Sequence, residues 1–453
     1  MSLLWVSVVL FLVLSFPIQV YLKSPFPSIV PYLIFAFAFL LSLLNQRVGI
    51  LSVSTSGRRG GIALMIHLYL LLLLINTGWQ VAWSVITLPE GVSAFVIYLL
   101  PVAFYYYFRR ATETEIRSIF IGIFLAGLVA GIFFAYDSYL KLALDQVSDY
   151  ANEAHEYSVI RAGATGEEFN DARIRPEFRS FGLLETHSVS GAWLVLSACA
   201  ALALLREDQK ILRRGIVLTF GILLLLGLNF TAIFTYLIVM FSLEFGGIEI
   251  IRSKAFAESF GSIMIYILLT SIVVVLGFSI ASDSMSSYMG ENLSFQGNLL
   301  LGTGDLDRSM LGLVLIYIER YLSHVFEFPL TIIFGDGFSS FGLLKGGDIG
   351  FVETVAKLGV PLSLIVILVL LRSIRVGLRM LATVSDHEGG LRTHVSKNSC
   401  IKFSLSMLFL VVITEGHYSI WHAKAVLPIV FFSLALLERY LPYDYSPLIP
   451  RSR

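Results

Sequence analysis

Long apolar runs fill most of the chain, and short polar connections separate them. A helix needs ~20 apolar residues to cross the hydrocarbon core of a bilayer, so each run predicts a transmembrane helix. The run over residues 215–251 is too long for one span, and we divide it near Asn229 into two short helices joined by a tight turn. The predicted spans are residues 1–22, 27–45, 62–87, 91–108, 117–136, 189–205, 214–228, 231–247, 260–280, 351–371, 400–414 and 424–440.

This pattern predicts an all-α polytopic membrane protein with about twelve transmembrane helices in a single domain over residues 1–453. The composition agrees, since 57% of the residues are hydrophobic and only 14% are charged, against ~25% charged in soluble domains. Cys199 and Cys400 both lie inside apolar runs, which argues against a disulfide framework. No P-loop or dinucleotide-binding fingerprint occurs, so a nucleotide-driven mechanism is not expected. No nucleic-acid partner is expected either.

Lysine and arginine are distributed unevenly between alternate connections, and cytoplasmic loops are the ones enriched in these residues. One set of alternate connections holds most of the 32 basic residues, whereas most acids fall on the other side. The alternation holds at every connection only with the division near Asn229. We therefore expect both termini in the cytoplasm, and two long polar loops, residues 137–188 and 281–350, on the extracytoplasmic side.

The first of these loops, residues 137–188, changes character along its length. Its early acids have the spacing of a solvated helix and favour a soluble lid; they are Asp137, Asp145, Asp149, Glu153 and Glu156. Pro176 then interrupts any helix and Gly182 permits a sharp turn. The second half of the loop is therefore expected to fold back toward the bilayer.

Arg173, Arg175 and Arg179 in this second half are candidates for binding an anion. Arginine close to the membrane is costly unless it is paired, and its planar guanidinium suits phosphate oxygens. The alternative is that the arginines pair with neighbouring acids or with lipid headgroups. Glu185 and His187 lie at the mouth of the next span, where either could accept a proton or serve as a hydrogen-bonded structural residue.

The second loop, residues 281–350, begins with a Ser-, Gly- and Asn-rich stretch and continues from Arg308 into an amphipathic helix. A helix on the membrane surface fits this stretch better than a span, because an apolar stripe recurs at helical spacing, at Leu311, Leu315, Ile318, Leu322 and Val325. A glycine-rich segment follows, with Lys345 and Asp348 in it and Glu353 at the start of the next span. The two carboxylates are either partners of the loop arginines or a general base and its support.

The last extracytoplasmic connection is rich in polar and aromatic side chains, namely Glu415, His417, Trp421, His422 and Lys424. Such residues are typical of the membrane interface, which favours a structural anchor. The alternative is that this connection forms one rim of an active site.

Three segments resemble bacterial O-antigen polymerases and ligases. They are RSFG before the span at 189–205, Arg308 at the opening of the amphipathic stretch, and GDGFSSFG followed by DIGFVETVAKLG at 335–359. Most of the chain also resembles this superfamily in its architecture, which is that of polytopic glycosyltransferases with a GT-C-like fold. The resemblance implies an undecaprenyl-diphosphate-linked oligosaccharide substrate, an active site facing outward from the bacterial inner membrane, and neither metal nor cofactor. A membrane protein that regulates chain length is a further expected partner.

By this resemblance, Arg179 and Arg308 correspond to the arginines of the family that hold the diphosphate, and Arg173, Arg175 and Lys345 are expected to assist them. The ligase branch has a His-Asn pair where this chain has Asp348 followed by Ile349 and Gly350. That departure favours a polymerase over a ligase.

In the expected mechanism, a sugar hydroxyl attacks the anomeric carbon of the lipid-linked donor and inverts it. The arginines stabilise the departing diphosphate, while Asp348, Glu185 or His187 orients or deprotonates the acceptor.

Other functions compete with this one. A transporter or flippase of an anionic lipid-linked solute would show repeats and broken helices with ionisable residues near the midplane, and the predicted spans are poor in charge. A polymerase of peptidoglycan strands and a non-catalytic scaffold are the remaining alternatives.

Overall fold

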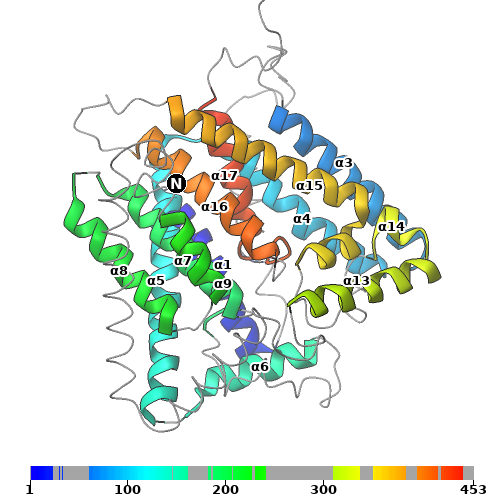
Figure 1. Cartoon of the computed structure of the whole chain (residues 1–453), viewed down its shortest axis with the longest axis horizontal. Coiled ribbons are helices and arrows are strands. Elements are labelled where there is room, and N and C mark those ends of the chain that lie inside the picture. The colour runs from blue at the N-terminus through cyan, green and yellow to red at the C-terminus, as the bar shows by residue number, and fades with distance from the viewer. Residues whose placement is uncertain are drawn as a thin grey trace, which may run out of the picture.

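The computed structural model describes residues 2–23, 61–144, 146–161, 182–184, 187–206, 208–226, 230–240, 310–336, 350–383, 395–416 and 420–441, with isolated positions at 30 and 33. In these ranges every regular element is a helix (Figure 1). The helices are α1 (Ser2–Leu22), α3 (Gly61–Ala82), α4 (Leu88–Phe108), α5 (Glu113–Leu144), α6 (Asp149–Arg161), α7 (His187–Leu204), α8 (Lys210–Leu226), α9 (Phe230–Val239), α13 (Met310–Glu327), α14 (Thr331–Phe334), α15 (Gly350–Thr383), α16 (Lys397–Glu415) and α17 (Leu427–Arg439).

Six of the described helices are long and apolar enough to cross a membrane: α1, α3, α4, α5, α15 and α16. The chain is thus a helical membrane protein, as its sequence predicts. The expected division near Asn229 is also confirmed, because α8 ends at Leu226 and α9 begins at Phe230. These two helices pack together, and the hydroxyl of Tyr236 donates to the carbonyl of Val217 at 2.6 Å. The expected spans at 27–45 and 260–280 lie outside the described residues.

The core forms around α5, which packs against α1, α7 and α8. Small residues permit this close approach, as in other membrane helix pairs. A methyl group on Gly127 would lie 1.6 Å from the hydroxyl of Ser197 on α7. That hydroxyl donates instead to the carbonyl of Ile123 at 2.8 Å, so the two helices are also joined by a hydrogen bond.

Two arginines assigned to the cytoplasmic connections, Arg109 and Arg439, lie at one end of the bundle. Arg109, after α4, pairs with Glu438 of α17 at 3.1 Å, and Arg439 pairs with Glu113 at the start of α5 at 2.8 Å. The ring of Trp5 lies 4.7 Å from that of Tyr107, so the beginning of α1 lies at this end as well. We call it the basic end.

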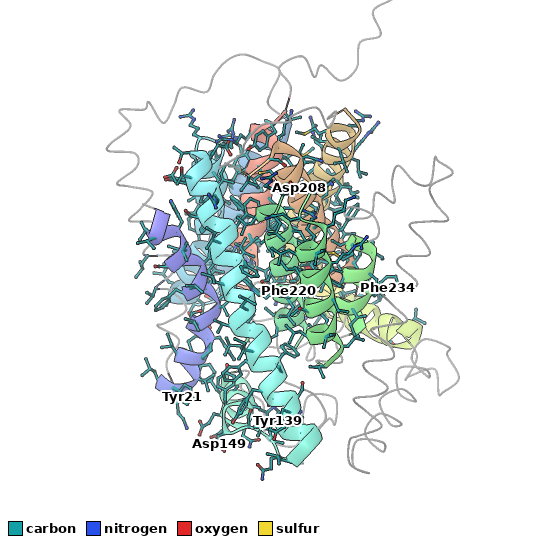
Figure 2. All side chains as sticks on the ribbon, turned by 90° about the vertical axis from the view of Figure 1, so that its left-hand side faces the viewer. Tyr21, Tyr139, Asp149, Asp208, Phe220 and Phe234 are labelled. Carbon is teal, nitrogen blue, oxygen red and sulfur yellow. The ribbon has the colours of Figure 1, made fainter. Side chains whose placement is uncertain are left out.

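The opposite end of the bundle carries the polar element α6. The ring of Tyr21, at the close of α1, lies 6.1 Å from that of Tyr150 in α6. Figure 2 shows Tyr21, Tyr139 and Asp149 at this end, and Asp208 toward the other. Among the described connections, those after α4 and before α5 thus lie at the basic end and the one before α6 lies at the other end, while the cytoplasmic identity of the basic end stays a prediction.

Helix α5 extends into the segment expected to form the first extracytoplasmic loop, residues 137–188. Helix α5 continues past residue 137 to Leu144, and Asp137 is only 1% exposed. Its carboxylate accepts a hydrogen bond from Ser148 at 2.8 Å, which joins α5 to the turn before α6. Asp149, Glu153 and Glu156 lie on α6, but this helix buries Ala151 and Ala154 and packs against α1 rather than standing free.

The amphipathic helix after Arg308 is present as α13. Three residues of its predicted apolar stripe, Leu315, Ile318 and Leu322, are exposed, whereas Val325 is buried. Next to it, α14 exposes Ile332 and Ile333. In Figure 1, α6 and α13 run across the direction of α5. The placement of α13 on the membrane surface stays a prediction.

Candidate functional site

The residues predicted from the sequence to bind and activate substrate fall largely outside the described part of the chain. These are Asp348, Glu185, Arg173, Arg175, Arg179, Arg308 and Lys345. Helix α7 begins at His187, but the position of its side chain lies outside the description as well. The diphosphate site and the general base therefore stay predictions.

The described elements that border those residues build a polar cluster. Helix α15 begins two residues after Asp348, and it is broken at Gly359, where φ is 72° and ψ is 164°. That conformation is essentially restricted to glycine. Pro361 follows, and its fixed φ suits the first turn of a new helix. Residues 360–383 would extend roughly 36 Å at 1.5 Å per residue, enough to cross a bilayer alone. Residues 350–358 thus form a separate segment, which we call the short segment of α15.

A second glycine holds the break in place. Gly335, at the end of α14, has a φ of 65°. A methyl group on Gly359 would lie 2.3 Å from the carbonyl oxygen of Ile333, and one on Gly335 would lie 2.4 Å from that of Lys357. The backbones of α14 and α15 therefore touch at Gly335 and Gly359, where neither helix has room for a side chain.

The last carbonyls of a helix have no partner within it, and the short segment of α15 ends in the protein interior. Its orphan carbonyls receive hydrogen bonds from outside the helix. The N–H of Asp336 donates to Ala356 at 2.8 Å. The side-chain amide of Gln80 donates to Lys357 at 3.4 Å, and that of Asn76 donates to Leu358. These contacts fix the short segment against α3.

The short segment carries a buried ion pair. Glu353 and Lys357 are one helical turn apart, and the ammonium group of Lys357 donates to the Glu353 carboxylate. The side chains are 11% and 2% exposed, respectively. Separating such a pair is costly, because the remaining charge would be buried without compensation. Each of the two charges therefore stabilises the other in the interior.

Beside this pair, a chain of hydrogen bonds links three helices and a connection. The hydroxyl of Tyr98 on α4 is bonded to Nδ1 of His422. Nε2 of His422 lies 3.2 Å from the hydroxyl of Thr354, which donates to the carboxylate of Glu415 at 3.1 Å. The N–H of Trp421 also donates to Glu415, at 2.7 Å. We call Tyr98, His422, Thr354 and Glu415 the hydrogen-bond chain. Burial, and secondarily the charge of Lys357, hold the pKa of His422 well below its usual range, so the ring is neutral near pH 7.

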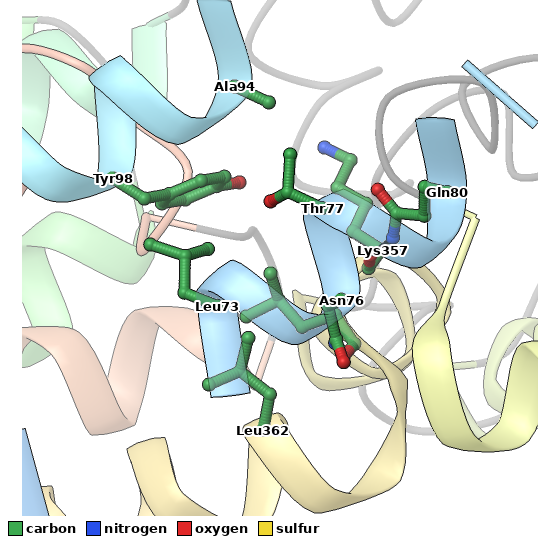
Figure 3. A pocket seen from close by; sticks show the side chains of 9 residues that line it. Leu73, Asn76, Thr77, Gln80, Ala94, Tyr98, Lys357 and Leu362 are labelled. Carbon is green, nitrogen blue, oxygen red and sulfur yellow. Dashed lines mark hydrogen bonds between the residues drawn. The ribbon is translucent and has the colours of Figure 1, made fainter. Parts of the chain in front are cut away.

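A small pocket opens between α3, α4 and α15 next to these groups. Its lining includes Asn76, Thr77, Gln80, Tyr98 and Lys357. In Figure 3 the hydroxyl of Tyr98, the side chain of Thr77 and the ammonium group of Lys357 point toward the same space. The pocket thus combines hydrogen-bonding groups with a cation in an otherwise apolar bundle.

Another polar contact joins α13 to the site. Nε2 of His324 lies 2.5 Å from the carboxylate of Asp336, and both side chains are largely buried. Burial raises the pKa of Asp336, and the neighbouring His324 opposes that shift. Since the N–H of Asp336 also bonds Ala356, this residue links α13 to the short segment of α15.

Sequence reasoning found part of this cluster. It named Glu353, Glu415 and His422, while the alternative that the last connection forms one rim of an active site stays a prediction. It missed Tyr98 and Lys357, as well as the capping amides Asn76 and Gln80. The sequence did contain a signal for the two amides. Asn76 and Gln80 are four positions apart in an apolar helix, so they lie on one face, and polar residues there indicate a functional or structural contact.

No protein-family model matches the chain, and no curated protein of known function is significantly similar to it. In the described part of the chain, no three His, Cys, Asp or Glu side chains are grouped so that they could hold a metal ion. The function is therefore argued from the chemistry of the site and from the resemblance of the three segments.

Proposed function

We propose that this protein is an inverting glycosyltransferase that polymerises polyprenyl-diphosphate-linked oligosaccharide repeats at the outer face of the bacterial inner membrane. The observation that carries the proposal is the buried polar cluster on the short segment of α15. It lies within the DIGFVETVAKLG segment that resembles O-antigen polymerases, and it contains Glu353, Thr354 and Lys357. A protein that only sits in lipid has no need to bury this many ionisable groups.

In the proposed reaction, the arginines of the two polar loops bind the donor diphosphate. Arg179 and Arg308 are the principal groups, with Arg173, Arg175 and Lys345 beside them. They stabilise the charge that develops as the sugar–diphosphate bond breaks. The acceptor hydroxyl attacks from the opposite face of the sugar, so the anomeric centre inverts. Because the lipid diphosphate is an activated leaving group, the reaction needs no nucleotide on the outer face.

The residues that orient the acceptor hydroxyl or accept its proton are proposed to lie on the segments next to the diphosphate. Asp348 precedes the short segment of α15 by two positions, His187 opens α7, and Glu185 comes two residues before His187 in the sequence. The same site in a ligase would transfer the glycan to a different acceptor. A membrane protein that regulates chain length is the proposed partner of the polymerase.

A second candidate, transport of an anionic lipid-linked solute, is favoured by one observation. Helix α15 is broken at Gly359 and carries an ion pair in its short segment, which is a common arrangement in transporters. The glycosyltransferase is preferred because three segments of the chain resemble O-antigen polymerases, and one of them, DIGFVETVAKLG, contains this cluster.

The test uses the purified protein in nanodiscs with an undecaprenyl-diphosphate oligosaccharide. Longer glycans and released lipid diphosphate are expected, and Arg179→Ala and Arg308→Ala should abolish both. Arg206→Ala is the matched control, because Arg206 is exposed, pairs with Asp208 and lies between α7 and α8. Full product from both loop variants would refute the diphosphate site. Intact substrate crossing a sealed vesicle, without elongation, would establish the transporter instead.

A further inference from the structure

The hydrogen-bond chain has a direction that its chemistry fixes. The hydroxyl of Thr354 donates its single proton to the carboxylate of Glu415 at 3.1 Å. The oxygen of Thr354 must then accept from Nε2–H of His422. This assigns Nδ1 as the unprotonated nitrogen, so Tyr98 donates to it. Each donor in the hydrogen-bond chain therefore points away from the pocket and toward Glu415.

The two ends of the hydrogen-bond chain suit different roles: Tyr98 can receive a proton and Glu415 can store it. Tyr98 lines the pocket, where a hydroxyl group can donate to its phenol oxygen while the cation of Lys357 lies close by (Figure 3). Glu415 lies at the far end, 3% exposed, and the N–H of Trp421 orients its carboxylate. His422 sits between them, and its surroundings disfavour a charged imidazolium. A proton entering at Tyr98 would thus pass through the ring rather than remain on it.

We propose that Tyr98, His422, Thr354 and Glu415 form a proton path that removes the proton of the acceptor hydroxyl during glycosyl transfer. This role rests on the proposed function: Tyr98 takes the proton, while the loop residues Asp348, Glu185 and His187 orient the acceptor hydroxyl. Tyr98 is the residue that would touch the substrate, and the other three are positioning and proton-carrying residues.

The acceptor oxygen forms a bond to the anomeric carbon as the bond from that carbon to the diphosphate oxygen breaks, and its electron pair leaves with the diphosphate. The acceptor proton moves to the oxygen of Tyr98, whose own proton moves to Nδ1 of His422. The Nε2 proton moves to Thr354, and the Thr354 proton moves to Glu415, which ends as a neutral acid. Return of that proton along the same path to water in the pocket, after the products leave, restores the starting state.

The experiment compares kcat, KM and the pH–rate profile of variants in the nanodisc polymerisation assay. Tyr98→Phe removes the entry hydroxyl, and Thr354→Val removes the central hydroxyl with little change in shape. Both should lower kcat by roughly 10²–10⁴-fold, the usual contribution of positioned proton transfer. KM should change little. The residual rate should rise with pH, since the acceptor must then lose its proton to solvent.

Two controls separate proton transfer from structure. Thr354→Ser keeps the hydroxyl and should restore most of kcat. Tyr106→Phe removes a hydroxyl from the same helix α4, where it contacts His67 at 3.1 Å outside the site, and should leave kcat unchanged. Thermal unfolding of each variant reports its folding.

The outcomes are distinct. Wild-type kcat and pH profile in both Tyr98→Phe and Thr354→Val would overturn the proton path and leave the polymerase intact. A lower kcat with an unchanged pH profile, or no rescue by Thr354→Ser, would also overturn it and assign the four residues a structural role. Absence of elongation by the wild-type protein would refute the proposed function and this path with it.

Discussion

Replacing Gly359 with alanine tests the break in α15 directly. The residue has a φ of 72°, and an added methyl group would lie 2.3 Å from the carbonyl oxygen of Ile333 and 2.8 Å from the nitrogen of Gly335. The backbone strain costs about 1–3 kcal/mol, and the forced displacement of packed backbone adds about 1–3 kcal/mol. Gly359→Ala should therefore destabilise the protein by roughly 2–6 kcal/mol.

Gly78→Ala provides the matched control. Gly78 lies within α3, is exposed, and has no atom within 4 Å of an added methyl group. Alanine is a better helix former than glycine by about 0.5–1 kcal/mol, so this variant should be slightly stabilised. Both substitutions add one methyl group, but Gly359→Ala should lower the free energy of unfolding and Gly78→Ala should raise it.

Thermal unfolding in detergent, followed by tryptophan fluorescence, measures both variants. At about 2 °C per kcal/mol, the lower end of the range for sizeable domains, Gly359→Ala should lower the midpoint by roughly 4–12 °C. Gly78→Ala should raise it by roughly 1–2 °C. The polymerisation rate should fall in Gly359→Ala as well, because the break positions Glu353, Thr354 and Lys357. Equal midpoints for the two variants would refute the argument that the structure requires glycine at 359.

Three further predictions follow from the buried groups and from the exposed face of α13. Lys357→Met should destabilise the protein by about 3–5 kcal/mol, because it leaves Glu353 buried without its partner. Adding Glu353→Gln should recover most of that loss in a double-mutant cycle, and a double variant no more stable than the single one would contradict the pairing. The folded state holds the pKa of His422 well below its usual range, so just below pH ~6.5 only the unfolded protein protonates this imidazole. The free energy of unfolding should therefore fall as the pH drops from about 7.5 to 5. His422→Gln should weaken that dependence, and an unchanged slope would exclude His422 as its source. Finally, a spin label at Phe326→Cys, a position 82% exposed on α13, should be more accessible to oxygen than to a water-soluble nickel chelate. The reverse order would place α13 in water rather than on the bilayer.

The sequence by itself determined the class of protein and much of its division into helices. Whether a segment enters a membrane depends on its own apolar length, which can be read locally. The division near Asn229 was predictable for the same reason, and α8 and α9 end and begin beside it. Charge in the connections predicted which of them share an end, and the pairing of Arg109 with Glu438 and of Arg439 with Glu113 agrees with that assignment.

The tertiary structure alone decided which polar side chains meet. Tyr98 and His422 are 324 residues apart, and their contact depends on how α4 and the last connection are placed relative to α15. Rotation and tilt of helices are set by packing, such as the approach of Gly127 to Ser197, and not by apolar length. The break at Gly359 had a local sign in the glycine and proline that flank Val360. The partners of the carbonyls freed by the break could not be predicted locally, because the amides of Asn76 and Gln80 come from a helix distant in the sequence.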